Sequence, residues 1–144
     1  VLPQPTSFSC QFTDAGFFPG TVRENMESVA EDAAEVWLER CDLAPFADQP
    51  PYQLSAGQQR KLQIAMALAR DARFYLLDEP LANLDDASKR KFFEMILQHT
   101  RGKTLVMVMH GDVALAGRFD RVLDLGAHSG VAERAARRPA TSPA

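Results

Sequence analysis

Several features that define other protein classes are scarce or absent in these 144 residues. No apolar run approaches the ~20 residues of a membrane-spanning helix, and no signal peptide is visible. The two cysteines, Cys10 and Cys41, are too few for a disulfide framework and lack metal-ligand spacing, so reduced thiols in the cytosol are expected. A net charge of −3 gives no electrostatic reason to expect nucleic-acid binding.

A complete phosphate-binding loop is also missing from the sequence. Such a loop follows the pattern G-x-x-x-x-G-K-[ST], in which backbone N–H groups and the lysine surround the phosphates. The only Gly-Lys-Thr here begins at Gly102, but Leu97 stands where the first glycine is required, and the tripeptide enters a predicted strand instead of opening a helix. The chain begins with Val1 and not with methionine, so we expect the true start of the protein to lie upstream.

What the chain does contain is typical of one globular domain. Hydrophobic residues make up 46% of the sequence and charged residues 24%, which is ordinary for a soluble protein. A length of 144 residues is enough for a hydrophobic core. From Ala127 onward the composition shifts to Ala, Arg and Pro, which predicts a disordered tail over residues 127–144.

The most informative stretch runs from Leu54 to Asp85. Ser55 and Gln58 have the spacing of a capping box, in which two side chains satisfy backbone N–H groups at a helix start. Apolar residues then recur with the spacing of one helix face. They are Leu62, Ala65, Met66 and Ala69. The apolar run Phe74–Leu77 is typical of a parallel strand covered on both faces.

Two acidic residues, Asp78 and Glu79, follow this run directly. Ligands of open parallel sheets bind outside the carboxyl ends of the strands, so this position favours a chemical role. Asp85 or Asp86 can cap a following helix, which Gly102 is expected to end. The predicted buried stripe of that helix comprises Phe92, Phe93, Ile96 and Leu97.

Further strands are predicted on either side of this stretch. Thr104–Met109 reads as a second buried strand, which His110 follows directly, and Arg121–Leu125 as another. The strand–helix–strand order indicates a right-handed parallel crossover. Near the start, Ser7–Phe12 predicts a short strand with Gln11 at its end.

A helical segment is predicted between the first strand and the capping box. Residues Glu31–Leu43 carry apolar side chains at helical spacing. The predicted buried face comprises Ala34, Trp37, Leu38 and Cys41. This pattern fits a small helical subdomain, in which Trp37 belongs to the core rather than to a ligand site. Prolines then break the chain before Leu54.

Four segments together resemble the motifs of ABC-type ATPases. Leu54–Gln58 (LSAGQ) resembles the signature loop, and Phe74–Glu79 resembles the Walker B strand with its following glutamate. Ala82–Asp85 resembles the D-loop, and His110 stands at the position of the switch histidine. The motifs occur in the family's order over roughly residues 7–126. The resemblance implies an α/β fold of the P-loop NTPase type, with a parallel sheet flanked by helices and a small helical subdomain.

The resemblance also implies how the chain is divided. Residues 1–126 would form the C-terminal part of a nucleotide-binding domain whose phosphate loop lies upstream of Val1. Residues 13–54 would contain the Q-loop region and the helical subdomain, and residues 55–126 the four motifs. The chain alone is therefore expected to be inactive.

The motif residues have implied roles in the hydrolysis of ATP bound to Mg²⁺. Asp78 would contact Mg²⁺, usually through water, and Glu79 would act as the general base. His110 would contact the γ-phosphate, although a histidine after a strand is often structural. Gln11 would reach the Mg²⁺ and the attacking water. A longer spacing than the family's separates Gln11 from Thr21, so a simple polar strand-end residue stays an alternative.

The signature loop has an implied role at a partner's nucleotide. Ser55, Ala56, Gly57 and Gln58 lie at a predicted helix start, where free N–H groups and the helix dipole favour an anion. In the family this loop contacts the γ-phosphate of ATP on a second ABC ATPase domain, and Asp85 helps to link the two sites. Ala56 replaces the commoner glycine. A helix cap without any ligand is the structural alternative.

The leading functional hypothesis is the ATPase component of a membrane transporter. The resemblance implies two partners, a second ATPase domain of the same or another chain and a transmembrane domain, fused or separate, at the cytoplasmic face of the inner membrane. One alternative is a soluble ABC ATPase of DNA repair or translation, which often carries a long coiled-coil insertion that this chain lacks. Another is a degenerate, non-catalytic subunit, against which Glu79 and His110 argue. Import, export and substrate stay open.

Overall fold

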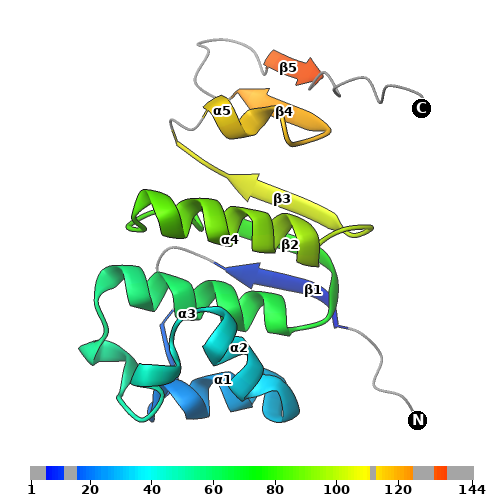
Figure 1. Ribbon diagram of the computed structural model, residues 1–144. Helices are drawn as coiled ribbons and strands as arrows, with labels where there is room; N and C mark the ends of the chain where they lie inside the picture. The colour runs from blue at the N-terminus through cyan, green and yellow to red at the C-terminus, as the bar shows by residue number, and fades with distance from the viewer. Residues whose placement is uncertain (1–5, 12–15, 111–112, 125–131, 136–144) are drawn as a thin grey trace, which may run out of the picture. The chain divides into compact units, whose positions relative to one another are not determined.

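The computed structural model describes residues 6–11, 16–110, 113–124 and 132–135. The chain divides into two compact units, one ending at Met109 and the other beginning at His110. The first unit contains a three-stranded parallel sheet and its helices, and the second contains a short helix and an antiparallel strand pair (Figure 1). Among the described residues no helix has the length and apolar character needed to cross a bilayer.

The helices and strands alternate as an α/β protein requires. In chain order they are β1 (Thr6–Gln11), α1 (Val22–Ala30), α2 (Ala34–Arg40), α3 (Ala56–Ala69), β2 (Ala72–Asp78), α4 (Asp86–His99), β3 (Thr104–Val108), α5 (Val113–Ala116), β4 (Arg121–Asp124) and β5 (Ala132–Ala135). Short 3-10 turns occupy Glu31–Ala33, Ala44–Phe46 and Pro51–Gln53. The predicted α/β fold with a parallel sheet is confirmed.

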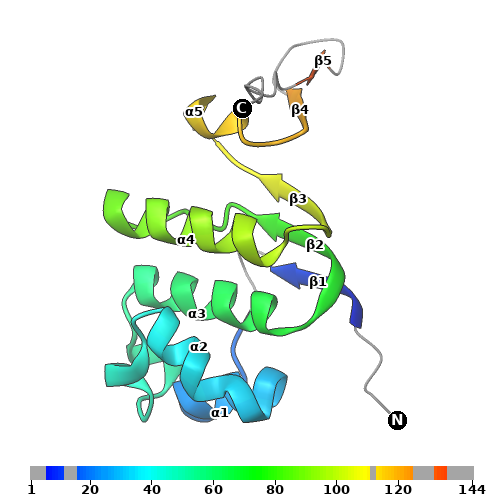
Figure 2. The same cartoon turned by 45° about the vertical axis from the view of Figure 1, so that its right-hand side comes forward.

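Helices α3 and α4 cover the same face of the sheet. The strand order is β1-β2-β3, and both pairings are parallel. On the covered face, Ser9 Oγ of β1 donates a hydrogen bond of 2.8 Å to the Ala67 carbonyl of α3. The Tyr75 ring of β2 meets the His99 ring of α4 edge-on at 5.9 Å. Both views show the two helices on one side of the strands (Figures 1 and 2).

Within the first unit, no described helix covers the opposite face, which we call the open face. Side chains alternate along each strand, and the register assigns to the open face Phe8, Cys10, Phe74, Leu76, Asp78, Val106 and Val108. Phe8, Val106 and Val108 are 46%, 42% and 41% exposed. The expectation that β2 and β3 are covered on both faces is therefore wrong for the described residues. Two right-handed crossovers that step in the same direction place both of their helices on one face.

The predicted helical subdomain is present as α1, α2 and the 3-10 turns around them. Thr21 caps α1 through a capping box with Glu24. The predicted face of α2 is confirmed, because each of its residues is buried. They are Ala34, Trp37, Leu38 and Cys41. Burial raises the pKa of the Cys41 thiol to about 12. The exact boundaries predicted for the subdomain stay predictions.

Two further segments differ in detail from the sequence analysis. In α4, Phe92, Phe93 and Ile96 are buried as predicted. The prediction was wrong for Leu97, which is only half-buried, and it missed Met95, which is buried. No regular structure was predicted after residue 126, yet β5 pairs antiparallel with β4. Strand pairing is decided by the neighbouring strand, and composition gives no signal for it. The rest of residues 127–144 lies outside the described part.

Protonation of His99 should destabilise the first unit. His99 lies against the rings of Trp37 and Tyr75. Its partial burial lowers the pKa of the imidazole, and the charges of Lys103 and Arg40 lower it further. The unfolded chain takes up this proton near pH ~6.5, whereas the folded chain resists it. The stability that neutral His99 contributes is therefore fully present above this pH and is lost as the pH falls through the lower pKa of the folded chain.

The measurement is urea unfolding of the parent chain and of His99→Gln above and below this range. We expect the glutamine variant to lose less stability in acid than the parent chain. An equal loss in both proteins would show that His99 is not the responsible group.

Candidate functional site

The predicted signature loop forms the capped start of α3. Ser55 Oγ accepts a hydrogen bond from Gln58 N at 3.2 Å, and the Gln58 side chain accepts from Ser55 N at 2.8 Å. Ser55 and Ala56 are exposed. The sequence analysis missed Gln59, whose amide donates to the carbonyls of Pro51 and Leu54 at 3.1 and 3.2 Å. These bonds hold the loop against the turn before it, and no spacing rule marks such a residue in advance.

Gly57 brings the signature loop against the predicted D-loop. A Cβ atom at Gly57 would lie 2.9 Å from the Asn83 carbonyl oxygen and 4.0 Å from Leu84 Cδ2. Real Cβ atoms essentially never come so close to backbone, so only glycine fits here without a shift. Residues 57 and 83 thus make one packed unit from two motifs that are far apart in sequence.

The two predicted Walker B acids lie at the carboxyl end of the central strand. Asp78 is the last residue of β2, and both acids are half-buried. Glu79 has a φ of +46°, which is uncommon for a residue with a side chain. Its N–H donates to the Val108 carbonyl at 2.9 Å, and its own carbonyl accepts from Ala82 N at 3.0 Å. Strained residues of this kind concentrate at functional sites.

Asp85 closes the turn that follows. Its carboxylate accepts from Ser88 N at 2.9 Å and from Ser88 Oγ at 2.8 Å, so it is the N-cap of α4. The backbone and hydroxyl hydrogen bonds of Ser88 lower the pKa of Asp85. Asn83 also has a positive φ, of 62°. Asp85 is exposed.

Gln11 and Asp78 end neighbouring strands but belong to opposite faces of the sheet. Gln11 pairs with Leu77 in the register, so its side chain belongs to the face that α3 and α4 cover, and it is 2% exposed. Asp78 belongs to the open face. The described structure therefore gathers the signature loop, the Walker B acids and the D-loop in one unit, and it places Gln11 on the other side of the strand plane from Asp78.

His110 is the first residue of the second unit and comes two positions after the end of β3. It is exposed. Its predicted role stays a prediction.

No group of three or more His, Cys, Asp or Glu side chains that could hold a metal occurs among the described residues. A protein site made of such a group is not what Mg²⁺ requires, since this ion keeps several waters and binds through one or two carboxylates plus substrate phosphates. Asp78 fits this donor set.

The family model described as "ABC transporter" matches residues 4–82, which is more than half of the chain. This chain belongs to the ABC transporter ATPase family. The motif names used above therefore apply to an ABC ATPase nucleotide-binding domain. The match itself ends within the D-loop.

Curated relatives and a solved structure agree with this assignment. The lipoprotein-releasing system ATP-binding protein LolD of Novosphingobium aromaticivorans is 37% identical over 80% of this chain and 51% of its own length. The macrolide export ATP-binding/permease protein MacB 1 of Aeromonas hydrophila subsp. hydrophila is 39% identical over 76% of this chain and 17% of its own length. The chain thus spans about half or less of these two relatives.

The solved structure is the dimeric ATP-binding cassette MJ0796, in a post-hydrolysis state with ADP and Pi. It is 30% identical with a TM-score of 0.72, over 82% of this chain and 58% of that one.

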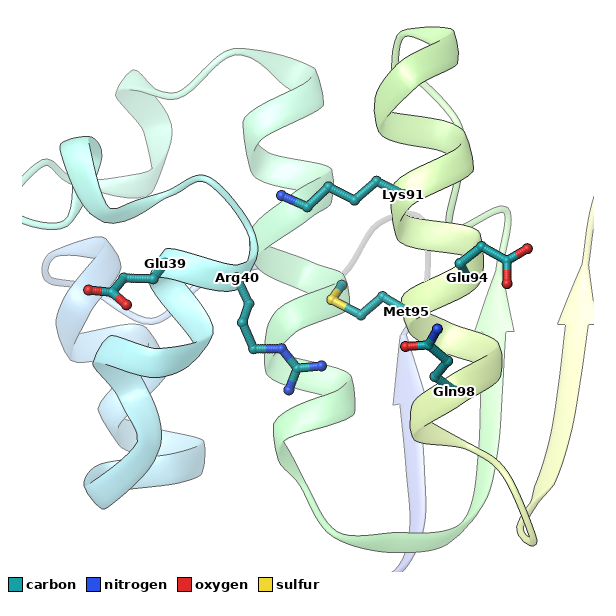
Figure 3. Close-up of a pocket in the computed structure, with 6 residues that line it drawn as sticks. All are labelled: Glu39, Arg40, Lys91, Glu94, Met95 and Gln98. Carbon is teal, nitrogen blue, oxygen red and sulfur yellow. The ribbon is translucent and has the colours of Figure 1, made fainter.

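A separate groove lies between α2 and α4 of this ABC ATPase chain, and none of the predicted site residues lines it. Figure 3 shows Arg40 and Lys91 reaching into it. The lining residues are Glu39, Arg40, Lys91, Glu94, Met95 and Gln98. Lys91 Nζ lies 2.7 Å from both carboxylate oxygens of Asp42, and the Arg40 guanidinium lies 4.6 Å above the Trp37 ring. Both cations have contacts within the protein, so we assign the groove a structural role.

Gly57→Ala should destabilise the domain by separating the signature helix from the D-loop. The added methyl would meet the Asn83 backbone oxygen at 2.9 Å, and overpacking of this kind costs about 1–3 kcal/mol. Gly16→Ala is the matched control, because a Cβ there meets nothing within 4 Å. Urea unfolding of both variants measures the difference. Equal stabilities would show that the Gly57–Asn83 contact yields without cost.

Proposed function

We propose that this chain supplies the signature loop, the Walker B acids and the D-loop of an ABC transporter ATPase. Two such domains would close on Mg²⁺-ATP, and hydrolysis would reopen them and drive transport. One observation carries the proposal. Glu79 is held with a positive φ directly after Asp78, at the carboxyl end of the central parallel strand. A strained carboxylate beside a second acid suits a base that orients water next to a metal-bound phosphate.

The residues present fit Mg²⁺ and ATP. Asp78 offers a carboxylate oxygen at the strand end, and bound ATP would add its phosphate oxygens as ligands, which completes the oxygen set that Mg²⁺ prefers. Gln11 is 2% exposed on the face opposite Asp78, which favours the alternative of a polar strand-end residue, so the proposal does not include it in the metal site. His110 would contact the γ-phosphate. The metal would neutralise the phosphate charge, and Glu79 would take the proton of the attacking water.

The signature loop is proposed to act on the partner's nucleotide. Ser55 and Ala56 are exposed at the start of the 14-residue helix α3, where free N–H groups favour an anion. The solved relative is a dimer with ADP and Pi, which supports a sandwich of two ATPase domains. Asp85 would link the two sites across it.

A transport role with a membrane partner is supported by the relatives. One is named as the ATP-binding protein of a lipoprotein-releasing system and the other as a macrolide export ATP-binding/permease protein. We infer a place at the cytoplasmic membrane face, against a transmembrane domain of the same or another chain. Both names favour outward movement over import. Neither of these two relatives is named as a soluble ATPase of DNA repair or translation.

Glu79→Gln tests the proposed chemistry in an ATPase that carries this chain together with a phosphate-binding loop. The amide keeps the size of the side chain but cannot accept the proton, and loss of a general base costs ~10²–10⁴ in rate. Removal of one negative charge beside the γ-phosphate also favours the closed dimer. We expect a stable ATP-bound dimer with very slow turnover.

The measurements are gel filtration with Mg-ATP and single-turnover hydrolysis. Asp78→Asn is the comparison, because it should weaken the Mg²⁺ dependence instead. Hydrolysis by the Glu79→Gln protein at the parent rate would rule Glu79 out as the base.

Ser55→Arg tests the role of the signature loop at the partner's nucleotide. The cation would occupy the space of the partner's γ-phosphate, so ATP-driven dimerisation should fail while ATP binding to each monomer persists. Ser55→Ala is the control: it loses the same helix cap, worth about 0.5–2 kcal/mol, without filling the site. If monomer affinity for ATP falls as far as dimerisation does, the loop acts on its own subunit's nucleotide.

A further inference from the structure

Asp42 joins three helices through one carboxylate. It follows the C-cap of α2, and Lys91 Nζ of α4 donates to both of its oxygens at 2.7 Å. The same Oδ2 oxygen lies 3.8 Å from Lys61 Nζ of α3. The Lys61 ammonium in turn lies 5.6 Å from the centroid of the Phe92 ring of α4. One negative charge therefore stands between two positive charges that belong to neighbouring helices.

Asp42 occupies a backbone position that favours glycine. Its φ is +59°, and its N–H donates to the Glu39 carbonyl at 3.1 Å, while the Leu43 N–H donates to the Leu38 carbonyl at 2.8 Å. This is the C′ position of a helix end, where glycine is usual because it has no Cβ. The hydrogen bonds of this turn come from the backbone, so the carboxylate contributes its contacts with the two lysines and not the turn.

The two lysines lie at the same depth below two functional loops. Lys61 and Lys91 are each five residues after the first residue of their helix, Ala56 in α3 and Asp86 in α4, which is about 7.5 Å along the axis. Helix α3 begins at the signature loop and α4 at the D-loop, and these loops pack against each other. Without a negative charge between them, the two ammonium groups would repel each other and push the two helix starts apart.

We propose that Asp42 is a positioning residue for the signature loop and the D-loop. Its charge holds the starts of α3 and α4 together, so that both loops keep the arrangement that a second ATPase domain recognises. The effect on dimerisation rests on the proposed function, whereas the effect on the two loops rests on the contacts of Asp42 alone.

The exposure of these side chains limits the size of the effect. Asp42 and Lys91 are 53% and 45% exposed, and Lys61 is 17% exposed. Ion pairs near the surface change an equilibrium by at most about fivefold each. Loss of the Asp42 charge should therefore favour opening of the two helix starts by roughly three- to tenfold, which the fold of a domain tolerates.

Hydrogen exchange in the full chain tests the positioning without nucleotide. The amides of Gln59 and Lys89 make the first backbone bonds of α3 and α4, to the carbonyls of Ser55 and Asp85, both at 2.8 Å. In Asp42→Asn their exchange should rise by roughly three- to tenfold, because asparagine tolerates a positive φ but carries no charge. Asp42→Gly should show the same rise, although glycine suits the backbone better.

A second substitution provides the rescue. When Asp42→Gly is combined with Lys91→Gln, the like charges no longer face each other, so exchange at both helix starts should return toward the parent rate. Asp71→Asn is the matched control, which should leave this exchange unchanged. It breaks an ion pair with Lys103 at 2.9 Å, beyond the opposite end of α3.

Two outcomes of the exchange experiment would overturn the proposal. Parent-like exchange in Asp42→Gly would show that Asp42 is no more than a helix end. Equal exchange in the single variant and in the combination with Lys91→Gln would show that like-charge repulsion is not what separates the helices.

Dimerisation with Mg-ATP is measured in an ATPase that carries this chain together with a phosphate-binding loop. Asp42→Gly should weaken dimerisation by roughly threefold or more, while the affinity of each monomer for ATP stays at the parent value. An equal fall in monomer affinity would show general damage and overturn the positioning role. A parent protein that does not dimerise with ATP would count against the proposed function, and the exchange rates would then decide the role of Asp42.

Discussion

Parallel pairing of β2 with strands on both sides is the constraint on which the rest of this structure depends. It brings the ends of three strands to one edge, where Asp78 and Glu79 leave the sheet. The Glu79 N–H continues the ladder by one further bond, to Val108. The direction in which the chain crosses from strand to strand then decides which face receives α3 and α4. The edge that bears Asp78 and Glu79 and the uncovered apolar face thus follow from one pairing scheme.

The signature loop and the D-loop are joined by a close backbone contact rather than by charged side chains. Gly57 and the Asn83 carbonyl hold the start of α3 against the turn after β2. Ser55 and Ala56 at the start of α3 are exposed, and the Ser55 hydroxyl accepts the Gln58 N–H as a local cap. The loop is therefore closely packed against its own domain at Gly57 and exposed at Ser55 and Ala56. This arrangement suits a surface that must recognise a ligand held by another molecule.

Much of this could be predicted from local signals. The capping box at Ser55 and Gln58, the cap at Asp85 and the buried face of α2 are set by contacts within a few residues, and the structure contains each of them. Burial of β3 was predicted wrongly, because an apolar strand looks the same whether or not another segment covers it. The pairing of β5 was missed for a related reason. The contact of Gly57 with Asn83 depends on residues 26 positions apart in the chain, which no local pattern reveals.

The backbone at Glu79 has a further consequence for how such a domain changes over time. A φ of +46° is comfortable for glycine and costs about 1–3 kcal/mol for a residue with a side chain. Glycine at this position would stabilise the turn and abolish the carboxylate. Stability alone therefore favours glycine over the acid at this position, and the proposed role of Glu79 as the base would be a reason to keep it. If Glu79 is the base, a copy of this domain that no longer hydrolyses ATP would have an energetic reason to lose Glu79 early, with no cost to its fold.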